Sequence, residues 1–469
     1  MMLNLPKEFI LGAATAAYQS EGATKVDGKG RVLWDYFLEE QGRFSPDPAC
    51  DFYHQYPIDL KNCRDFNITS LRVSIAWSRI FPDGSGRIEP KGVAFYHQLF
   101  KEMRTNGIEP YVTLHHFDTP EVLFSQGDWL NKEMIDHFVN FAVFCFKEFS
   151  EVRYWITINE PTTLAKQQRI TGTFPPGEKF QFHKCFQQQH YMNVAHARVI
   201  NKFRELSLPG EIGIVHAIQT VYPYSDKESD RTAALRQDVL ENKFLLDGTL
   251  KGSYSLELLA IVDTILTENQ QERINITERD LAELEQAARK VDFVGVNYYY
   301  SKFIEAYDGP SEFIHNGTGT KGSAKRKIAN VGQEVFRNDL PMTDWDWPIY
   351  PKGLRDTLKR IHNDYPQVKA IYITENGLGM KESPDQSGNI NDSARIEYIE
   401  SHLKEVAKVM KEGVPVKGYF VWSLQDMFSW TNGYNKRYGL FYVDFETQAR
   451  TPKQSAYWYK ELIERKGKI

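Results

Sequence analysis

The apolar residues of this 469-residue chain gather in short runs, and eight of these runs are rich in β-branched and aromatic residues. Most of the runs are apolar almost without interruption, as is typical of parallel strands that are covered on both faces. The runs lie at residues 9–15, 68–77, 109–117, 153–159, 211–218, 292–300, 369–376 and 416–424. The pattern predicts eight buried strands.

Between several of these runs, apolar residues recur at helical spacing. Asn131 has the chemistry of an N-cap residue and precedes an apolar stripe that runs from Met134 to Cys145. A second helical segment, at residues 354–366, stops at a proline. Eight strands alternating with helices predict an α/β fold, a closed (β/α)8 TIM barrel, because repeated right-handed crossovers bring the last strand beside the first.

Long insertions follow the fifth and sixth predicted strands. Residues 307–327 are rich in Gly, Ser and Lys, and we expect them to form an exposed loop over the top of the barrel. Neither a Pro-rich linker nor an internal repeat divides the chain. We therefore expect one catalytic barrel domain over residues 1–469.

Composition and charge narrow the function classes. The formal net charge of -5 disfavours a nucleic-acid binder, which usually carries a basic surface. The four cysteines lack the spacing of zinc ligands or of a disulfide scaffold, so we expect no metal, no cofactor and a reducing cytoplasm. Residues 9–17 imitate a signal peptide, but we interpret them as the first core strand, and no run approaches the roughly 18 apolar residues of a membrane span. The oligomeric state stays open.

Polar and aromatic residues lie within or directly after most of the predicted strands. In chain order they are Arg72, His115, His116, Asn159, Glu160, Asn297, Tyr299, Glu375 and Trp422. In a barrel these positions converge on one pocket at the carboxyl ends of the strands. Amides and carboxylates suit sugar hydroxyls, and flat rings suit sugar faces, so the set indicates carbohydrate chemistry.

Two of these residues could cleave a glycosidic bond. Glu160 lies in TINEP after the fourth predicted strand, and Glu375 lies in ITENG at the end of the seventh. A single glutamate at the end of a strand is more often a structural hydrogen-bond acceptor. As a pair in one pocket, the two carboxyl groups could supply the proton donor and the nucleophile or base that the reaction needs.

The order of the motifs resembles that of the family-one retaining β-glycosidases, over essentially the whole chain. The motifs are GAATAAYQSEG, LRVSIAWSRI, TLHHFDTP, TINEP, NYYY, ITENG and WSLQDMFSWTNGYNKRYGLFYVDF. The resemblance implies Glu160 as acid/base and Glu375 as nucleophile, supported by Arg72 and Tyr299. Around the sugar we expect Gln19, His116, Asn159, Asn297 and Trp422.

One departure from the family pattern changes the expected substrate. Where β-glucosidases of the family read Phe-Glu-Trp, this chain has Ser429 in place of the glutamate, which removes a charge that a 6-phosphate would not tolerate. Alternation in an extended segment would point Lys436 and Tyr438 one way and Arg437 the other, leaving Arg437 a structural role. An ammonium and two hydroxyls could then bind one phosphate, in a pattern similar to that of the 6-phospho-β-glycosidases. The plainer interpretation is a solvated loop.

Trp430 resembles the tryptophan of the 6-phospho-β-galactosidases. Such a tryptophan suits a galactoside, because an axial 4-hydroxyl exposes an apolar sugar face that an indole can cover. Trp347, in TDWDWPIYP, is expected to be a platform for the leaving group. The expected substrate is lactose 6-phosphate, a small-molecule disaccharide. Two alternatives stay open: a 6-phospho-β-glucosidase or an enzyme of dual specificity, and more remotely a non-catalytic sugar-phosphate sensor.

Overall fold

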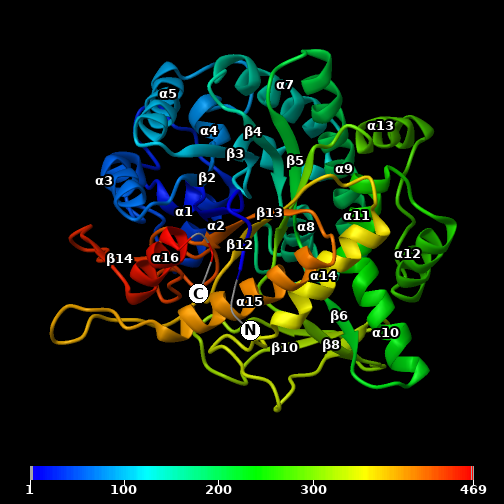
Figure 1. Ribbon diagram of the computed structural model, residues 1–469. Coiled ribbons are helices and arrows are strands. Elements are labelled where there is room, and N and C mark those ends of the chain that lie inside the picture. The colour runs from blue at the N-terminus through cyan, green and yellow to red at the C-terminus, as the bar shows by residue number, and fades with distance from the viewer. Residues whose placement is uncertain (1–3, 466, 468–469) are drawn as a thin grey trace.

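Eight parallel strands form a closed barrel in the computed structural model, which describes residues 4–465 and 467 (Figure 1). Around the barrel the order is β1-β13-β12-β7-β5-β4-β3-β2, and each strand pairs in parallel with its neighbours. Their bounds are β1 (Ile10–Ala14), β2 (Ser70–Ser74), β3 (Glu109–His115), β4 (Tyr154–Asn159), β5 (Glu211–Ala217), β7 (Phe293–Asn297), β12 (Ile371–Asn376) and β13 (Val416–Trp422). All eight predicted strands and the (β/α)8 fold are confirmed.

Aromatic side chains fill part of the barrel interior. Tyr111 on β3 contacts Phe420 on β13, with ring centroids 4.9 Å apart, although β1 and β2 separate those strands in the sheet. The contact therefore crosses the inside of the barrel. A Cβ atom on Gly12 of β1 would lie 2.7 Å from the Phe420 ring, so this position needs a glycine.

Helices surround the barrel, as Figure 1 shows. They are α1 (Ala17–Ser20), α2 (Leu33–Gln41), α3 (Phe52–Asp65), α4 (Trp77–Ile80), α5 (Pro90–Thr105), α6 (Glu121–Ser125), α7 (Glu133–Glu148), α8 (Pro161–Arg169), α9 (Phe182–Glu205), α10 (Glu228–Asp238), α11 (Phe244–Leu246), α12 (Leu256–Glu268), α13 (Glu278–Ala288), α14 (Pro351–Asp364), α15 (Ser393–Lys411) and α16 (Gln454–Glu464). Both predicted helices occur, as α7 and α14. The Asn131 side chain accepts a hydrogen bond from the Glu133 backbone N–H at 3.0 Å, although the cap position is Lys132. None of the helices in the described ranges is long and apolar enough to cross a membrane.

The two insertions meet in a small five-stranded sheet of order β6-β8-β11-β10-β9. Its strands are β6 (Val221–Pro223), β8 (Lys302–Glu305), β9 (Glu312–Ile314), β10 (Lys325–Ile328) and β11 (Gly332–Glu334), and a two-stranded sheet pairs β14 (Phe441–Val443) with β15 (Arg450–Pro452). Residues 307–327, predicted to form an exposed loop, therefore also contribute two short strands, β9 and most of β10. Between these two strands, Asn316 and Asp346 accept hydrogen bonds from backbone N–H groups of the glycine-rich stretch, which stabilises its conformation.

Candidate active site

A pocket at the carboxyl ends of the barrel strands brings together most of the residues predicted for the site. Those that line it are Gln19, His116, Asn159, Glu160, Tyr299, Trp347, Glu375, Trp422, Ser429, Trp430, Lys436 and Tyr438. Arg72 and Asn297 do not line the pocket; both are buried behind its wall, where they hydrogen-bond to the two glutamates.

The Glu375 carboxyl group is held from both sides. Arg72 Nη1 donates to Glu375 Oε1 at 2.6 Å, and Tyr299 OH donates to Oε2 at 2.7 Å. Burial and the nearby Glu375 charge keep the pKa of Tyr299 well above its usual value, so this phenol remains a donor. The arrangement fixes one carboxylate at the end of β12 with a cation beside it.

Glu160 follows β4 at a constrained position. It is the N-cap of α8, with Pro161 next in the chain, and its φ of 44° lies in the left-handed region. Asn297 Nδ2 donates to Glu160 Oε1 at 2.6 Å. Among the described residues no cation forms an ion pair with Glu160, whereas Glu375 pairs with Arg72.

Burial raises the pKa of both glutamates. The pKa of Glu375 rises to about 7, because burial and the neighbouring Glu160 outweigh the Arg72 charge and the donors that lower it. The pKa of Glu160 also rises, chiefly through burial and against the Asn297 hydrogen bond. Because the two carboxyl groups interact, they titrate as a pair, and their raised pKa values favour a state in which they share one proton.

An amide and an imidazole extend this network toward the pocket. Asn159 Oδ1 accepts from Arg72 and Asn297, at 2.6 and 3.1 Å, so its Nδ2 faces His116 Nε2 at 3.2 Å as a donor. The proton of His116 then lies on Nδ1, which has no partner among the described residues. Gln19 Oε1 is likewise without a described partner, while its Nε2 donates to Phe428 O. Both residues line the pocket, so a hydroxyl group of a ligand could partner each of these atoms.

Lys436 is buried among aromatic rings. Its side chain is almost inaccessible, at 2% exposure, and its Nζ lies 3.4 Å from the Trp347 centroid, 4.7 Å from that of Trp345 and 5.4 Å from that of Tyr438. No carboxylate in the described part of the chain forms an ion pair with it. Burial, with help from the Arg326 charge, holds the pKa of Lys436 well below its usual value.

The neighbours of Lys436 alternate as the extended segment predicts. Tyr438 lines the same pocket, with its ring centroid 6.1 Å from that of Tyr299. Arg437 instead donates to Asp426 Oδ2 and Val443 O, each at 2.8 Å. Its guanidinium is therefore a structural group and leaves Lys436 as the cation of this segment that lines the pocket.

Comparison with known proteins identifies the family. Residues 1–468 match glycosyl hydrolase family 1. The chain belongs to this family. It is 57% identical over 468 residues to a 6-phospho-beta-galactosidase of Lacticaseibacillus casei, and 54% identical over 469 residues to one of Staphylococcus aureus, each comparison covering 99% of both chains. A solved structure of the family 1 b-glucosidase from Thermotoga maritima matches with a TM-score of 0.88, at 34% identity and with 99% of both chains covered.

Sequence reasoning missed several residues that line the pocket, including Gln167, Phe174, His315 and Asn432. Gln167 had a usable signal, because it lies seven residues after Glu160, two turns along α8 and on the same face. His315 had none, since it follows β9 in the segment predicted to be an exposed loop.

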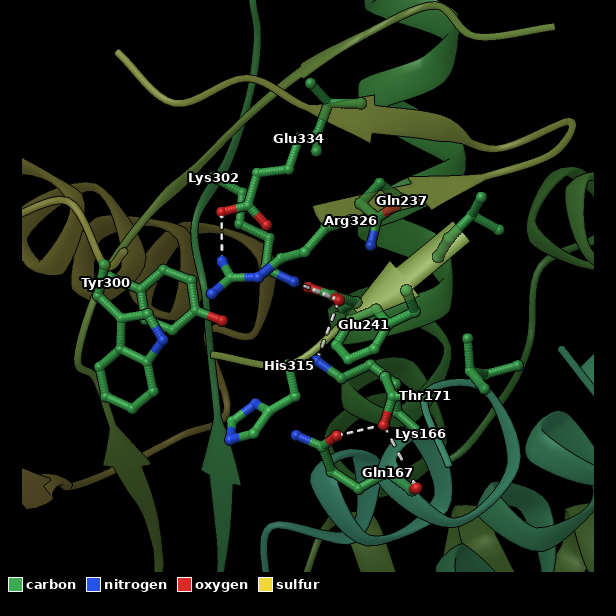
Figure 2. A pocket seen from close by; sticks show the side chains of 15 residues that line it. Lys166, Gln167, Thr171, Gln237, Glu241, Tyr300, Lys302, His315, Arg326 and Glu334 are labelled. Carbon is green, nitrogen blue, oxygen red and sulfur yellow. Dashed lines mark hydrogen bonds and ion pairs between the residues drawn. The ribbon is translucent and has the colours of Figure 1, made fainter. Parts of the chain in front are cut away.

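A second pocket adjoins the first, and Gln167, His315 and Trp347 line both. Figure 2 shows charged side chains paired across it. Lys166 and Lys302 both donate to Glu241 Oε1, at 3.0 and 2.5 Å, and Arg326 donates to Glu334 at 2.7 Å. The described residues contain no group of three His, Cys, Asp or Glu side chains that could hold a metal ion.

Proposed function

We propose that this protein is a retaining 6-phospho-β-galactosidase that hydrolyses lactose 6-phosphate to galactose 6-phosphate and glucose. The proposal combines the carboxyl pair of the pocket with the name carried by relatives that are more than half identical over nearly the whole chain. The two glutamates would act by double displacement, as in retaining glycosidases generally.

The observation that carries the phosphate specificity is the environment of Lys436. A buried lysine without a carboxylate partner lies in the same pocket as Glu160 and Glu375. A phosphate dianion supplies the missing countercharge through a charge-assisted hydrogen bond. Ser429 and Tyr438 bring hydroxyl groups to the same pocket, and serine at position 429 leaves no carboxylate to repel the phosphate.

In the first step Glu375 attacks the anomeric carbon while Glu160 protonates the departing oxygen. We assign the shared proton to Glu160, because Arg72 and Tyr299 donate to Glu375 and stabilise its ionised form, whereas Glu160 has no paired cation among the described residues. A covalent glycosyl-enzyme and free glucose result.

In the second step Glu160 acts as a base. Ester formation removes the negative charge of Glu375, and with it the repulsion that links the two groups. The pKa of Glu160 then falls, so its carboxylate can take a proton from the incoming water. Water attacks from the face that the aglycone left, and the product keeps its β configuration.

Trp430 supports the galactoside over the glucoside. Its indole lines the pocket and stacks on Tyr18, with the ring centroids 5.3 Å apart and the planes 1° from parallel. A ring held in this way can cover the apolar face of a sugar whose 4-hydroxyl is axial. The cytoplasmic location we propose agrees with four buried cysteines that are all free thiols.

The test compares kcat/KM for the 2-nitrophenyl derivatives of 6-phospho-β-galactoside, 6-phospho-β-glucoside and unphosphorylated β-galactoside. We expect the phosphorylated galactoside to be the best substrate. Equal rates on both phosphorylated sugars would replace the proposal with a dual-specificity enzyme, and a faster glucoside would make it a 6-phospho-β-glucosidase. Binding of galactose 6-phosphate without turnover of any substrate would indicate a sensor.

A further inference from the structure

The indole of Trp347 is covered on both faces. The Lys436 ammonium lies 3.4 Å from its ring centroid, and the Tyr300 ring stacks on it at 4.9 Å with an interplanar angle of 18°. Cation–aromatic contacts extend to about 6 Å. The described contacts of Lys436 include Trp345, Trp347 and Tyr438 but not Tyr300. The ammonium and the phenol ring therefore lie on opposite faces of the indole.

Charged groups fix the Tyr300 ring from the second pocket. Arg326 Cζ lies 5.5 Å from the Tyr300 centroid and Lys302 Nζ lies 5.9 Å from it. Figure 2 shows both cations beside Tyr300, with Arg326 paired to Glu334 and Lys302 paired to Glu241. These pairs leave little freedom to the phenol ring, and through it to the indole.

A buried ammonium ordinarily needs a carboxylate partner, since an isolated charge is costly to remove from water. A carboxylate beside Lys436 would also compete with a phosphate for the same cation and repel the phosphate. An indole face attracts a cation through its quadrupole and carries no net charge. Trp347 therefore offsets part of the cost of burying the Lys436 ammonium. A phosphate dianion can then bind the ammonium without first displacing a carboxylate.

We propose that Trp347 is a positioning residue for phosphate recognition: its indole, backed by Tyr300, holds the Lys436 ammonium in a place where a buried ammonium would otherwise need a carboxylate. This inference rests on the proposed function, because it takes Lys436 as the cation that binds the 6-phosphate. It adds to the leaving-group role expected for Trp347.

The charge state of Lys436 gives a readout that a purely structural role would not change. The charged or titratable groups around it are Arg326, His315 and Tyr438, and the two glutamates line the same pocket. A cation–π contact favours the protonated amine. Without the indole, Lys436 loses its proton at a lower pH, so phosphate affinity falls at a lower pH than in the wild type.

The experiment measures the affinity of the full-length protein for galactose 6-phosphate and for galactose by calorimetry across pH, because neither ligand has a leaving group. Trp347→Leu should weaken galactose 6-phosphate binding by about 10- to 30-fold and leave galactose binding nearly unchanged. Trp347→Phe, which keeps a π face, should lose less. The matched control is Trp458→Leu on α16, since Trp458 is also half-buried but does not line the pocket.

Three outcomes would overturn the inference: equal weakening of both ligands, an unshifted pH dependence of galactose 6-phosphate binding in Trp347→Leu, or a loss confined to kcat/KM for lactose 6-phosphate relative to its nitrophenyl analogue. The last result would leave Trp347 only the role of a platform for the leaving sugar. Lys436→Ala is measured in parallel. If that variant keeps full affinity for galactose 6-phosphate, the proposed phosphate site itself is wrong, which separates its failure from that of the Trp347 inference.

Discussion

Replacing Arg72 by methionine should move the pH dependence of catalysis. The guanidinium is 1% exposed and donates to Glu375 Oε1 at 2.6 Å, so it is the main group that opposes the effect of burial on this carboxyl. An opposite charge at such a distance lowers a carboxyl pKa by about 1 to 3 pH units. Without it, the pKa of Glu375 should rise from about 7 to roughly 8 to 10.

The nucleophile must be ionised, and a higher pKa delays its ionisation as pH rises. The acidic limb of kcat/KM should therefore shift to higher pH, and activity at pH 7 should fall roughly 5- to 500-fold from this cause alone. The assay is hydrolysis of the phosphorylated nitrophenyl galactoside over a pH range from about 5 to about 10. Thr113→Val is the control, because it removes the hydrogen bond of 3.1 Å to Arg72 Nε but leaves the charge in place. An acidic limb that stays where it is in Arg72→Met would refute the assigned role of the guanidinium.

Three further variants test the catalytic glutamates, the proposed phosphate site and the buried ion pairs of Glu241. Glu160→Ala should retain activity on activated leaving groups such as dinitrophenolate and lose it on nitrophenolate or sugars, with added azide accelerating the second step; equal losses on all leaving groups would contradict the acid/base assignment. Ser429→Glu should shift the preference in kcat/KM toward unphosphorylated galactosides, and an unaltered preference would place the phosphate elsewhere. Glu241→Gln should lower the midpoint of thermal unfolding through a loss of about 3 to 5 kcal/mol, because it leaves two buried lysines without their carboxylate, whereas Glu205→Gln at an exposed ion pair should change the midpoint little.

The barrel could be predicted because each of its strands is a nearly continuous apolar run, which only burial on both faces explains. The small five-stranded sheet could not be predicted. Its strands have three or four residues each, and β6 pairs with β8 across about 80 intervening residues, so no local sequence pattern indicates the pairing. Polar side chains such as Asn316 and Asp346 are what stabilise the glycine-rich stretch, and their partners are visible only in three dimensions.

In the candidate site, too, some residues could be predicted from local sequence patterns and others could not. Glu160 and Glu375 end predicted strands, so barrel geometry alone brings them to one pocket. Trp347 lies in a long insertion, and its sequence context predicts an aromatic ring near the substrate without saying which faces of the ring are open. The contacts with Lys436 and Tyr300 decide that question, and they join segments that are far apart in the chain.

The most direct test of phosphate recognition is the ratio of kcat/KM for the phosphorylated over the unphosphorylated nitrophenyl galactoside, measured in the wild type and in Lys436→Ala. Removing a buried, charge-assisted contact costs about 2 to 5 kcal/mol, so the ratio should fall by roughly 30-fold to several thousandfold. Activity on the unphosphorylated galactoside should change little. A ratio in Lys436→Ala equal to that of the wild type would contradict the account, because the phosphate would then bind elsewhere.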